Sequence, residues 1–552
     1  MLVRVKTEGE SRSLRLRSAA RVVLTRGPVV VPKWGLSSGL LCPPIGIAYI
    51  AATLREHGFP VSIVDPVGES HDEVHPIAGR AAVAYGWSLE QIVAAIPRDT
   101  SYVGLACMFS QEWPVSKALA RMIRERLPRA VIVAGGEHMT AAAEESLRDC
   151  PAIDYAVIGE GEETMLELLE TLEHGEDASR VAGLCYLRGG QAVRTAPRAR
   201  LREVDQIPRP AWDLVPIETY LANNLSYGVG QGRTMPILAT RGCPYECTFC
   251  SNPTMWTTRW YARSPADVAD EIEFYTLRYA ATNFDFYDLT AILRKDWIKD
   301  FCQELVKRNL KITWQLPAGT RSEAVDEEVA GLLASCGHRN IVYAPESGSE
   351  RILKIIKKKV RPERMRDSMK AAVRHGISVK LNMIIGFPME TFTDVLRSYH
   401  FLVKAAWLGV DDATIATFVP YPGSELFRDL RAQGRIAELS DGFYFGLLAI
   451  GGSRHAPSFD EHLSSRALSL CKLVGHALFY GVSYLRRPQR FAQTFWHLYR
   501  KDHHTRIEKA LDAIFARSTL GRGGVSPGAV RKPPASAPAK HRAHSAAAGR
   551  GQ

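Results

Sequence analysis

The sequence predicts an α/β protein in which a doubly wound parallel sheet comes first, a partial barrel of six β/α units second, and a helical region last. Hydrophobic, β-branched segments alternate with helical stretches from residue 21 to about residue 175, which is typical of a parallel sheet covered by helices. Six more strand candidates, separated by helical stretches, follow from about residue 234 and indicate the barrel. A chain of 552 residues also exceeds the usual size of one hydrophobic core.

The first region contains five expected strands and at least three helices. The strands are expected at residues 21–25, 61–65, 102–107 and 130–136, with a fifth that starts at residue 155 and runs into a Gly/Glu turn and a helix. Apolar residues at helical spacing predict helices over 45–58 and 113–127. A shorter β-rich stretch (183–197) and a proline-rich linker (207–216) follow, so a domain boundary is expected there.

The second region contains six expected strands, followed by a helical region and a tail. The strands are expected at residues 235–242, 283–288, 311–316, 340–346, 379–388 and 413–420. Residues 455–516 have a helical pattern, and the Ala, Pro, Gly, Lys and Arg composition after residue 518 predicts disorder. The expected parts are a flexible N-terminus (1–20), a first domain (21–205), a linker (206–233), a barrel (234–450), a helical region (451–518) and a basic tail (519–552).

Charge and hydropathy narrow the class of protein. The net charge is +11, but residues 519–552 carry six basic and no acidic side chains, so the remainder carries only about +5. No DNA- or RNA-binding motif accompanies this charge, and we expect no nucleic-acid partner. The N-terminal residues do not resemble a signal peptide, and Lys472 and His476 interrupt the longest apolar stretch. We therefore expect a cytoplasmic protein without a transmembrane segment, which leaves room for a C-terminal helix lying on a membrane surface.

Three of the ten cysteines form a motif. Cys243, Cys247 and Cys250 make a C-x3-C-x2-C run directly after the first strand of the second region, where a barrel places its active-site loop. Three thiolates can bind three irons of a four-iron cube and leave the fourth iron open. Structural zinc would usually need a fourth Cys or His, which the local sequence lacks, and three unrelated thiols would be the trivial alternative. The motif predicts a [4Fe–4S] cluster.

An open iron that can chelate an amino and a carboxylate group is the arrangement of radical S-adenosylmethionine (SAM) enzymes, and the motif resembles that family. The resemblance implies that Phe249 packs near the SAM adenine, although simple packing beside the cluster is the alternative. Glu346 and Ser347 begin a Glu-Ser-Gly-Ser segment similar to one that binds SAM in relatives, and a plain strand-to-helix turn capped by Ser349 is the alternative. Gly386 lies in a Gly-Phe-Pro motif that would let the adenine approach the backbone.

The first region resembles the Rossmann-like, cobalamin-binding domain that precedes the barrel in one radical SAM subfamily. The fragments that carry the resemblance span residues 43–65, 130–147 and 154–164. They imply cofactor contacts from six residues: Pro44, Gly135, Gly136, His138, Gly159 and Glu160. The Asp-x-His-x-x-Gly motif of many cobalamin enzymes is absent, since Asp72, His75 and Gly79 have the wrong spacing. No histidine is therefore expected to bind cobalt, and His138 is expected at a loop or at the corrin edge.

These resemblances imply a cobalamin-dependent radical SAM methyltransferase that C-methylates an unactivated carbon of a small metabolite or natural-product intermediate. A 5′-deoxyadenosyl radical formed from SAM would remove a hydrogen atom, and methylcobalamin would supply the methyl group. The implied electron donor is a protein such as flavodoxin or ferredoxin. The chain is also similar to the anaerobic magnesium-protoporphyrin ester cyclase, so a cyclase or oxidative ring-modifying enzyme without methyl transfer is the first alternative. A cobalamin sensor would not need the cysteines, and tRNA modification lacks an RNA-binding module.

Overall fold

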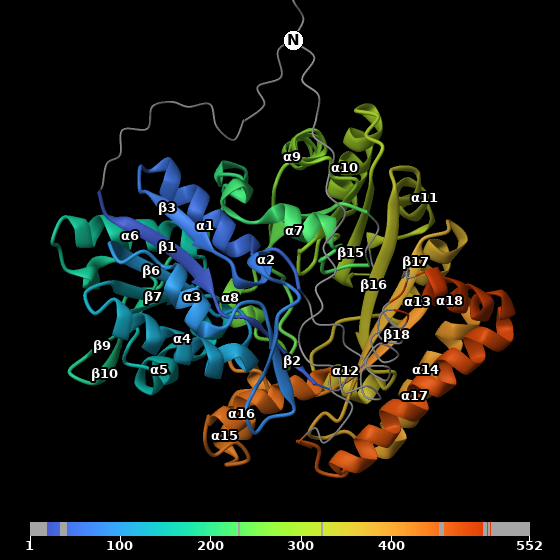
Figure 1. Cartoon of the computed structure of the whole chain (residues 1–552). Coiled ribbons are helices and arrows are strands. Elements are labelled where there is room, and N and C mark those ends of the chain that lie inside the picture. The colour runs from blue at the N-terminus through green and yellow to red at the C-terminus, as the bar shows by residue number, and fades with distance from the viewer. Residues whose placement is uncertain are drawn as a thin grey trace, which may run out of the picture.

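The computed structural model describes residues 19–33, 41–229, 232–321, 324–451 and 457–500, together with Thr505 and Glu508. Two sheets built mainly of parallel strands lie next to each other, one formed by the N-terminal part of the chain and one by the C-terminal part (Figure 1). The expected basic tail, and all but the last two residues of the expected flexible N-terminus, lie outside the described residues. The predicted α/β fold with its two regions is confirmed.

The first sheet has seven strands in the order β10-β9-β8-β7-β6-β1-β3. Five of them are parallel and two form an antiparallel hairpin at the edge. The parallel strands are β1 (Arg21–Arg26), β3 (Val61–Val64), β6 (Thr100–Ala106), β7 (Val131–Gly135) and β8 (Tyr155–Val157), and the hairpin is β9 (Leu184–Arg188) with β10 (Gln191–Arg194). The strand order reverses between β1 and β6, and ligands of doubly wound sheets bind outside the carboxyl ends of the strands at such a point.

Helices cover both faces of this sheet, because its strands are apolar on both sides. Val22 and Leu24 of β1 pack against one layer of helices, and Val23 between them packs against the other. The first layer is α1 (Ile45–Glu56) and α6 (Gly161–Glu173), and the second is α3 (Leu89–Ala95), α4 (Trp113–Arg126) and α5 (Glu137–Asp149). This sandwich of helix, sheet and helix is the doubly wound arrangement expected from the sequence.

A small antiparallel sheet was not expected from the sequence. It consists of β2 (Val29–Pro32), β5 (Ala82–Tyr85) and β4 (Val74–Pro76), paired in that order. Each strand has only three or four residues, and two of the strands contain proline, which weakens the local strand signal. The sheet extends from the carboxyl end of β1, so it borders the ligand-binding edge of the first sheet.

The second sheet has six parallel strands in the order in which they occur in the chain, which confirms the partial barrel of six β/α units. The strands are β11 (Thr234–Ile237), β14 (Asn283–Phe286), β15 (Thr313–Thr320), β16 (His338–Glu346), β17 (Ser378–Ile385) and β18 (Asp412–Thr417). The connecting helices are α9 (Pro265–Tyr279), α10 (Lys295–Lys307), α11 (Glu327–Ser335), α12 (Glu350–Ile355), α13 (Pro362–Arg374) and α14 (Phe392–Leu408).

The strand expected over residues 235–242 is divided. β11 ends at Ile237, and Thr240–Arg241 forms a separate strand, β12, that pairs antiparallel with β13 (Tyr261–Ala262). The chain between β12 and β13 contains the three clustered cysteines and the short helix α8 (Asn252–Trp256). The hairpin thus holds both ends of the cysteine loop together at the carboxyl end of the barrel.

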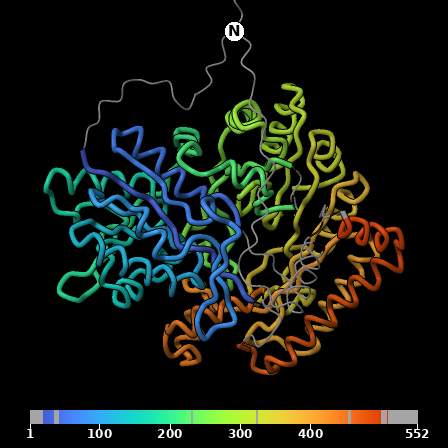
Figure 2. The backbone as a smooth tube through the Cα atoms, in the orientation of Figure 1, coloured from blue at the N-terminus to red at the C-terminus, as the bar shows by residue number. Residues whose placement is uncertain are grey.

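The C-terminal helices attach to both domains. α17 (Ser465–Arg486) packs along α14 and β18, and Leu468, Cys471 and Phe479 on its inner face join the core of the barrel. α16 (Asp441–Gly446) instead packs against the first domain, where Tyr444 belongs to the same core cluster as Trp113. The remaining C-terminal helices are α15 (Glu425–Ala432) and α18 (Pro488–Arg500). Figure 2 shows the two halves of the backbone packed along a shared boundary.

Candidate cofactor site between the two sheets

The cysteine loop is anchored at its start by residues of the barrel. Asp288, which follows β14, is buried, and its carboxylate accepts hydrogen bonds from the amides of Ala239 and Thr240. Gly242 has a φ angle of +94°, and a β-carbon there would collide with the carbonyl oxygen of Arg259. Burial raises the pKa of Asp288 to about 6. Asp288 therefore fixes the backbone at the start of the cysteine loop. Asp285 has a different partner, since it accepts a hydrogen bond from the Gly228 amide at 2.6 Å.

Cys243, Cys247 and Cys250 are all free thiols and all partly exposed. Burial raises the pKa of Cys250 to about 12 and also raises that of Cys247, where the nearby positive charge of Lys358 acts in the opposite direction. Within the described part of the chain, no three His, Cys, Asp or Glu side chains converge as ligands of a single ion would. Thiolates bound to separate irons of a cube stand farther apart than ligands of one ion. Three soft thiolates on one loop fit an iron–sulfur cluster better than mononuclear zinc.

Phe249 lies beside the turn that contains Gly386. The ring of Phe249 lies 5.7 Å from that of Phe387, which follows Gly386 at the end of β17. Gly386 has a φ angle of +84°, and its amide donates to the carboxylate of Glu390, whose pKa burial raises to about 8. A β-carbon at Gly386 would lie 2.8 Å from Leu468 Cδ1, so α17 closes this side of the turn.

Glu346 ends β16 with a left-handed φ of +68° and is buried. Its carboxylate pairs with the ammonium of Lys358 at 2.8 Å, and the Lys358 nitrogen also lies 5.9 Å from the centre of the Phe249 ring. Burial raises the pKa of Glu346, against the effect of Lys358. The acidic Glu346 expected at the end of this strand is thus paired with Lys358. The ammonium group of Lys358 also lies near Phe249, which stands between Cys247 and Cys250.

Ser347 has partners within the protein. It is 1% exposed, and its hydroxyl accepts from the Ser349 amide at 3.1 Å and lies 3.3 Å from the Ser398 hydroxyl on α14. Ser349 stands at the N-cap position of α12, but its hydroxyl donates to Asp394 at 2.6 Å and makes no capping bond. The two serines fasten the turn to α14, and the expected contact of Ser347 with SAM stays a prediction.

In the first domain the carboxyl edge of the sheet forms an open, partly apolar surface. Met108 and Phe109 follow β6 and are 50% and 44% exposed. Gly136 follows β7 with a φ angle of +109°, and a β-carbon there would lie 2.5 Å from the Cys107 carbonyl oxygen. Gly135 precedes it, and the buried Pro44 stands at the N-cap position of α1. Exposed apolar side chains beside glycine turns are a suitable surface for a large, flat, largely apolar ring.

His138 lies inside the domain. Its exposed fraction is 1%, its Nδ1 lies 2.9 Å from the Ser110 hydroxyl and its Nε2 lies 3.0 Å from the Ser146 hydroxyl. Its ring packs 5.0 Å from Trp113 and 5.4 Å from Tyr444. Burial lowers the pKa of His138 to about 3, so the ring is neutral. Both ring nitrogens thus have hydroxyl partners within the protein, and the expected contact of His138 at a loop or at the corrin edge stays a prediction.

Glu160 is also occupied, but at the boundary between the domains. Gly159, with a φ angle of +81°, leads into the buried Glu160 carboxylate, which pairs with Arg200 at 2.7 Å and with Arg241 at 3.1 Å. Arg241 pairs as well with Glu162, at 2.6 Å. The Gly-Glu-Gly-Glu turn therefore binds the residue two positions before Cys243, and the expected contact of Glu160 with cobalamin stays a prediction.

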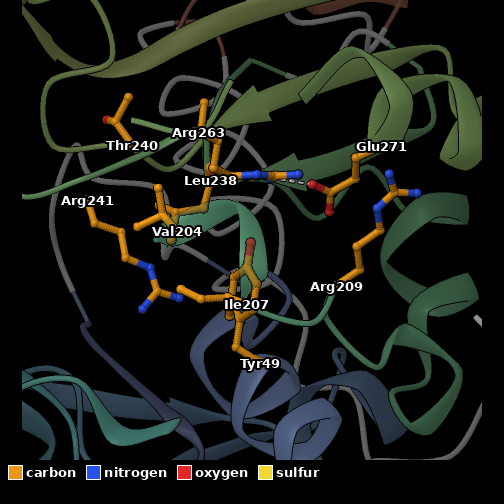
Figure 3. A pocket seen from close by; sticks show the side chains of 10 residues that line it. Tyr49, Val204, Ile207, Arg209, Leu238, Thr240, Arg241, Arg263 and Glu271 are labelled. Carbon is orange, nitrogen blue, oxygen red and sulfur yellow. Dashed lines mark hydrogen bonds and ion pairs between the residues drawn. The ribbon is translucent and has the colours of Figure 1, made fainter. Parts of the chain in front are cut away.

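Figure 3 shows a small pocket at this boundary, and its lining includes Thr240 and Arg241, which precede the cysteine loop. Arg263 points toward Glu271, whereas Arg241 points away from Glu271 and toward the first domain. Tyr49 extends from α1 into the lining of the pocket. Arg209 lines the same pocket with a side chain that is 8% exposed and lies 4.0 Å from Asp267. The pocket is thus lined by the linker residue Arg209, by Tyr49 of α1 and by residues of the barrel.

Two further hydrogen bonds join the carboxyl edges of the two sheets, and a third joins α8 to the segment after β18. Ser251, next to Cys250, donates a hydrogen bond to Glu137 at the start of α5. Thr254 donates to the Gly423 carbonyl oxygen at 2.7 Å, and Tyr421 donates to Gln111 at 3.3 Å. Tyr421, which follows β18, therefore faces the first domain across the site.

Four charged residues of this site were missed by the sequence reasoning: Glu137, Arg241, Lys358 and Glu390. Glu137, Arg241 and Glu390 lie within two residues of a motif that was identified. Lys358 lies nine residues after the Glu-Ser-Gly-Ser turn. Their partners are up to 114 residues away in the chain. Closeness to a motif in the sequence was the one signal that could have pointed to these residues. It does not show which side chain each of them would contact.

Comparisons with known proteins agree with the two domains. A family model described as "B12 binding domain" matches residues 34–169, and one described as "Radical SAM superfamily" matches residues 237–402. An uncharacterized methyltransferase of Pyrococcus horikoshii is 30% identical over 390 residues, which cover 70% of this chain and 78% of the relative. The cytidylyl-2-hydroxyethylphosphonate methyltransferase of Streptomyces wedmorensis is 29% identical, with 71% and 78% coverage. The anaerobic magnesium-protoporphyrin IX monomethyl ester cyclase of Rubrivivax gelatinosus is 27% identical, with 70% and 66% coverage.

Solved structures share the fold. The radical SAM methyltransferase TsrM of Kitasatospora setae, solved with cobalamin and a [4Fe–4S] cluster, aligns with a TM-score of 0.60 and 18% identity over 75% of each chain. The cobalamin-dependent radical SAM enzyme OxsB aligns with a TM-score of 0.63 and 15% identity, over 91% of this chain and 71% of OxsB. At these identities the alignments bear on the fold, including the order of the sheet, barrel and helical regions.

Proposed function

Since this chain belongs to the radical SAM enzymes that carry a B12-binding domain, we propose that it methylates an unactivated carbon of a small metabolite or natural-product intermediate. The family uses a [4Fe–4S] cluster, SAM and cobalamin. When bound, the cluster and SAM supply a carbon-centred radical and cobalamin supplies the methyl group. The protein's own task is to position these groups around one substrate and to exclude water from the radical.

One observation carries the proposal: the carboxyl edges of the two sheets face each other across direct contacts. Ser251 bonds to Glu137, and Arg241 bonds to Glu160 and Glu162, so the cysteine loop lies against the ligand-binding edge of the first domain. A radical formed at one cofactor and a methyl group held at another can act on the same carbon only if both cofactors border one space. In this proposal the facing edges border that space.

We propose the following roles for individual residues. Cys243, Cys247 and Cys250 bind the cluster. Phe249 and Gly386 contact the SAM adenine, and Glu346, held by Lys358 at 2.8 Å, accepts a hydrogen bond from a SAM hydroxyl or ammonium group. The cobalamin-binding residues are proposed to be Pro44, Gly135, Gly136 and Gly159. A small electron-transfer protein such as flavodoxin or ferredoxin is the proposed source of the reducing electron.

Anaerobic reconstitution with iron, sulfide and cobalamin, followed by incubation with SAM and a reductant, tests the proposal. The expected results are formation of 5′-deoxyadenosine and, with the correct substrate, a product heavier by one methylene unit. Cys247→Ala should abolish 5′-deoxyadenosine formation. Reconstituted protein that binds no four-iron centre, or that binds tetrahedral zinc at these cysteines, would contradict it.

A cyclase or oxidative ring-modifying enzyme is the second candidate function. It is favoured by the similarity to the Rubrivivax gelatinosus cyclase, which covers 70% of this chain. The same contacts would serve this reaction, because it needs the same positioning of a substrate between the two sheets. Product mass distinguishes the two functions: a product with an unchanged carbon count that still depends on Cys247 would favour ring modification.

A further inference from the structure

α17 has two apolar faces, and only one of them is covered. Leu468, Cys471 and Phe479 are buried in the barrel core. On the opposite side the helix exposes a row of large apolar side chains at helical spacing. These are Leu470 (61% exposed), Leu473 (67%), Val474 (37%), Leu478 (37%) and Leu485 (86%). A surface helix normally turns polar residues to the solvent, so an apolar outer face indicates a missing partner.

The exposed apolar surface continues onto the neighbouring helices. α14 lies beside α17 (Figure 1) and exposes Phe392, Leu396 and Trp407. α18, which follows α17, exposes four aromatic side chains: Phe491, Phe495, Trp496 and Tyr499. The guanidinium of Arg486 on α17 lies 5.3 Å from the centre of the Trp407 ring, which connects the surfaces of α17 and α14. We call the exposed residues of these three helices the helical face.

The charge of the helical face has one sign. The sequence of residues 465–500 contains no acidic residue. Arg466 and Arg486 of α17 are exposed, whereas Arg490 pairs with Asp411. On α14, Arg397 and Lys404 are exposed, whereas the acidic Asp394 is buried and paired with Arg351. Residues 519–552, close behind α18 in the chain, add six more basic residues and no acidic ones. The partner of this face is therefore expected to be apolar and negatively charged.

We propose that the helical face binds the surface of an anionic phospholipid membrane, with α17 lying in the plane of the interface. Apolar side chains would enter the boundary between headgroups and acyl chains, Trp and Tyr would lie at headgroup level, and basic residues would contact lipid phosphates. The proposal does not depend on the proposed reaction.

α17 is long and apolar enough to cross a bilayer by length and composition. It does not span one in this fold, because its inner face belongs to the barrel core. A second copy of the chain fits the helical face less well than a membrane does. A symmetric dimer would bring two basic surfaces together without acidic partners. A nucleic acid would be attracted by the charge but would leave the leucine row uncovered.

Vesicle co-sedimentation of the full-length protein tests the proposal. Binding to vesicles that contain phosphatidylglycerol should exceed binding to pure phosphatidylcholine vesicles by about tenfold, and high salt should reduce it. Leu473→Glu and Phe495→Glu each place a carboxylate on the helical face and should reduce binding by about tenfold or more. Leu277→Glu is the matched control, because Leu277 on α9 is 81% exposed and lies outside this face.

Sedimentation velocity and SAM cleavage by the same variants complete the experiment. Unchanged SAM cleavage by Leu473→Glu shows that the variant is folded and that loss of vesicle binding is not loss of the enzyme. The proposal is overturned if the protein stays in the supernatant with every vesicle composition, if Leu473→Glu binds as well as the unmodified protein, or if the protein is a dimer that Leu473→Glu dissociates.

Discussion

Arg241 Nη2 lies 2.6 Å from Glu162 Oε1, and both side chains are more than nine-tenths buried. The other terminal nitrogen of Arg241 lies 3.1 Å from Glu160, and its guanidinium lies 5.1 Å from the centre of the Tyr49 ring. Arg241 precedes Gly242 and Cys243, whereas both glutamates belong to the first domain. One buried arginine therefore fixes the cysteine loop against the sheet that is proposed to hold cobalamin.

Arg241→Met should strongly destabilise the protein. Without the arginine, the buried carboxylates of Glu160 and Glu162 each lose one ion-pair partner. Removing one member of a buried ion pair lowers the free energy of unfolding by about 3–5 kcal/mol. Urea denaturation measures the loss. Arg294→Met is the control: Arg294 pairs with Asp296 on the surface, so its loss should cost less than about 1 kcal/mol. Equal losses in the two variants would contradict the interdomain role of Arg241.

Cys247→Ala should lose the iron–sulfur cluster. Two thiolates cannot bind three irons of the cube, so the iron content after anaerobic reconstitution should fall to background, as should the visible absorption of the cluster. Cys185→Ala is the control, because Cys185 is a buried thiol in the first sheet. Retention of four irons by Cys247→Ala would rule out the assigned ligand set.

Gly136→Ala should destabilise the first domain and weaken cobalamin binding. Its φ angle of +109° disfavours a side chain, and the new β-carbon would lie 2.5 Å from the Cys107 carbonyl oxygen, so the turn after β7 would have to move. Gly46→Ala is the matched control: no atom lies within 4 Å of its β-carbon, and it sits in α1, so stability should rise by about 0.5–1 kcal/mol. Thermal denaturation measures the stability of each variant, and titration with cobalamin measures its affinity for the cofactor. Normal cobalamin binding by Gly136→Ala would argue against a cofactor turn there.

The pH dependence of stability should report on His138. Its pKa is about 3 in the folded protein, below the ordinary value of 6.5, so between these values the unfolded chain binds the additional proton. The contribution of the neutral His138 to the free energy of unfolding is complete above pH 6.5. It is lost as the pH falls toward 3, by up to about 1.4 kcal/mol per pH unit. His138→Gln should therefore lose less stability between pH 6.5 and 4.5 than the unmodified protein, measured by urea denaturation. His174→Gln, at an exposed site after α6, is the control.

Lys358→Met should impair both stability and SAM binding. It leaves the buried Glu346 carboxylate without its 2.8 Å partner, and the pKa of Glu346 should rise further. The double variant Glu346→Gln/Lys358→Met should recover most of the stability, because no unpaired charge remains. It should still bind SAM about tenfold or more weakly, measured by equilibrium dialysis, if Glu346 contacts SAM. Full recovery of SAM affinity in the double variant would limit Glu346 to a structural role.

Local patterns predicted most of the fold. The spacing of apolar residues that predicts β1, α1 and α4 can be read from a few neighbouring residues. These elements therefore begin and end close to the residues expected from the sequence. The division of residues 235–242 into β11 and β12 was not predictable, because β12 forms by pairing with Tyr261–Ala262 across the cysteine loop. The small sheet of β2, β4 and β5 was missed for the same reason, since three or four residues stabilise a strand only once a partner strand is present.

The sequence by itself determined the order of the two domains and the identity of the cysteine loop, because spacing and periodicity are properties of neighbouring residues. The tertiary structure decided which polar side chains face the site. His138 and Ser347 turned inward to hydroxyl partners, and Glu160 turned to Arg241, 81 residues away. A buried polar group must find a partner, and which partner it finds depends on the segments that folding brings beside it.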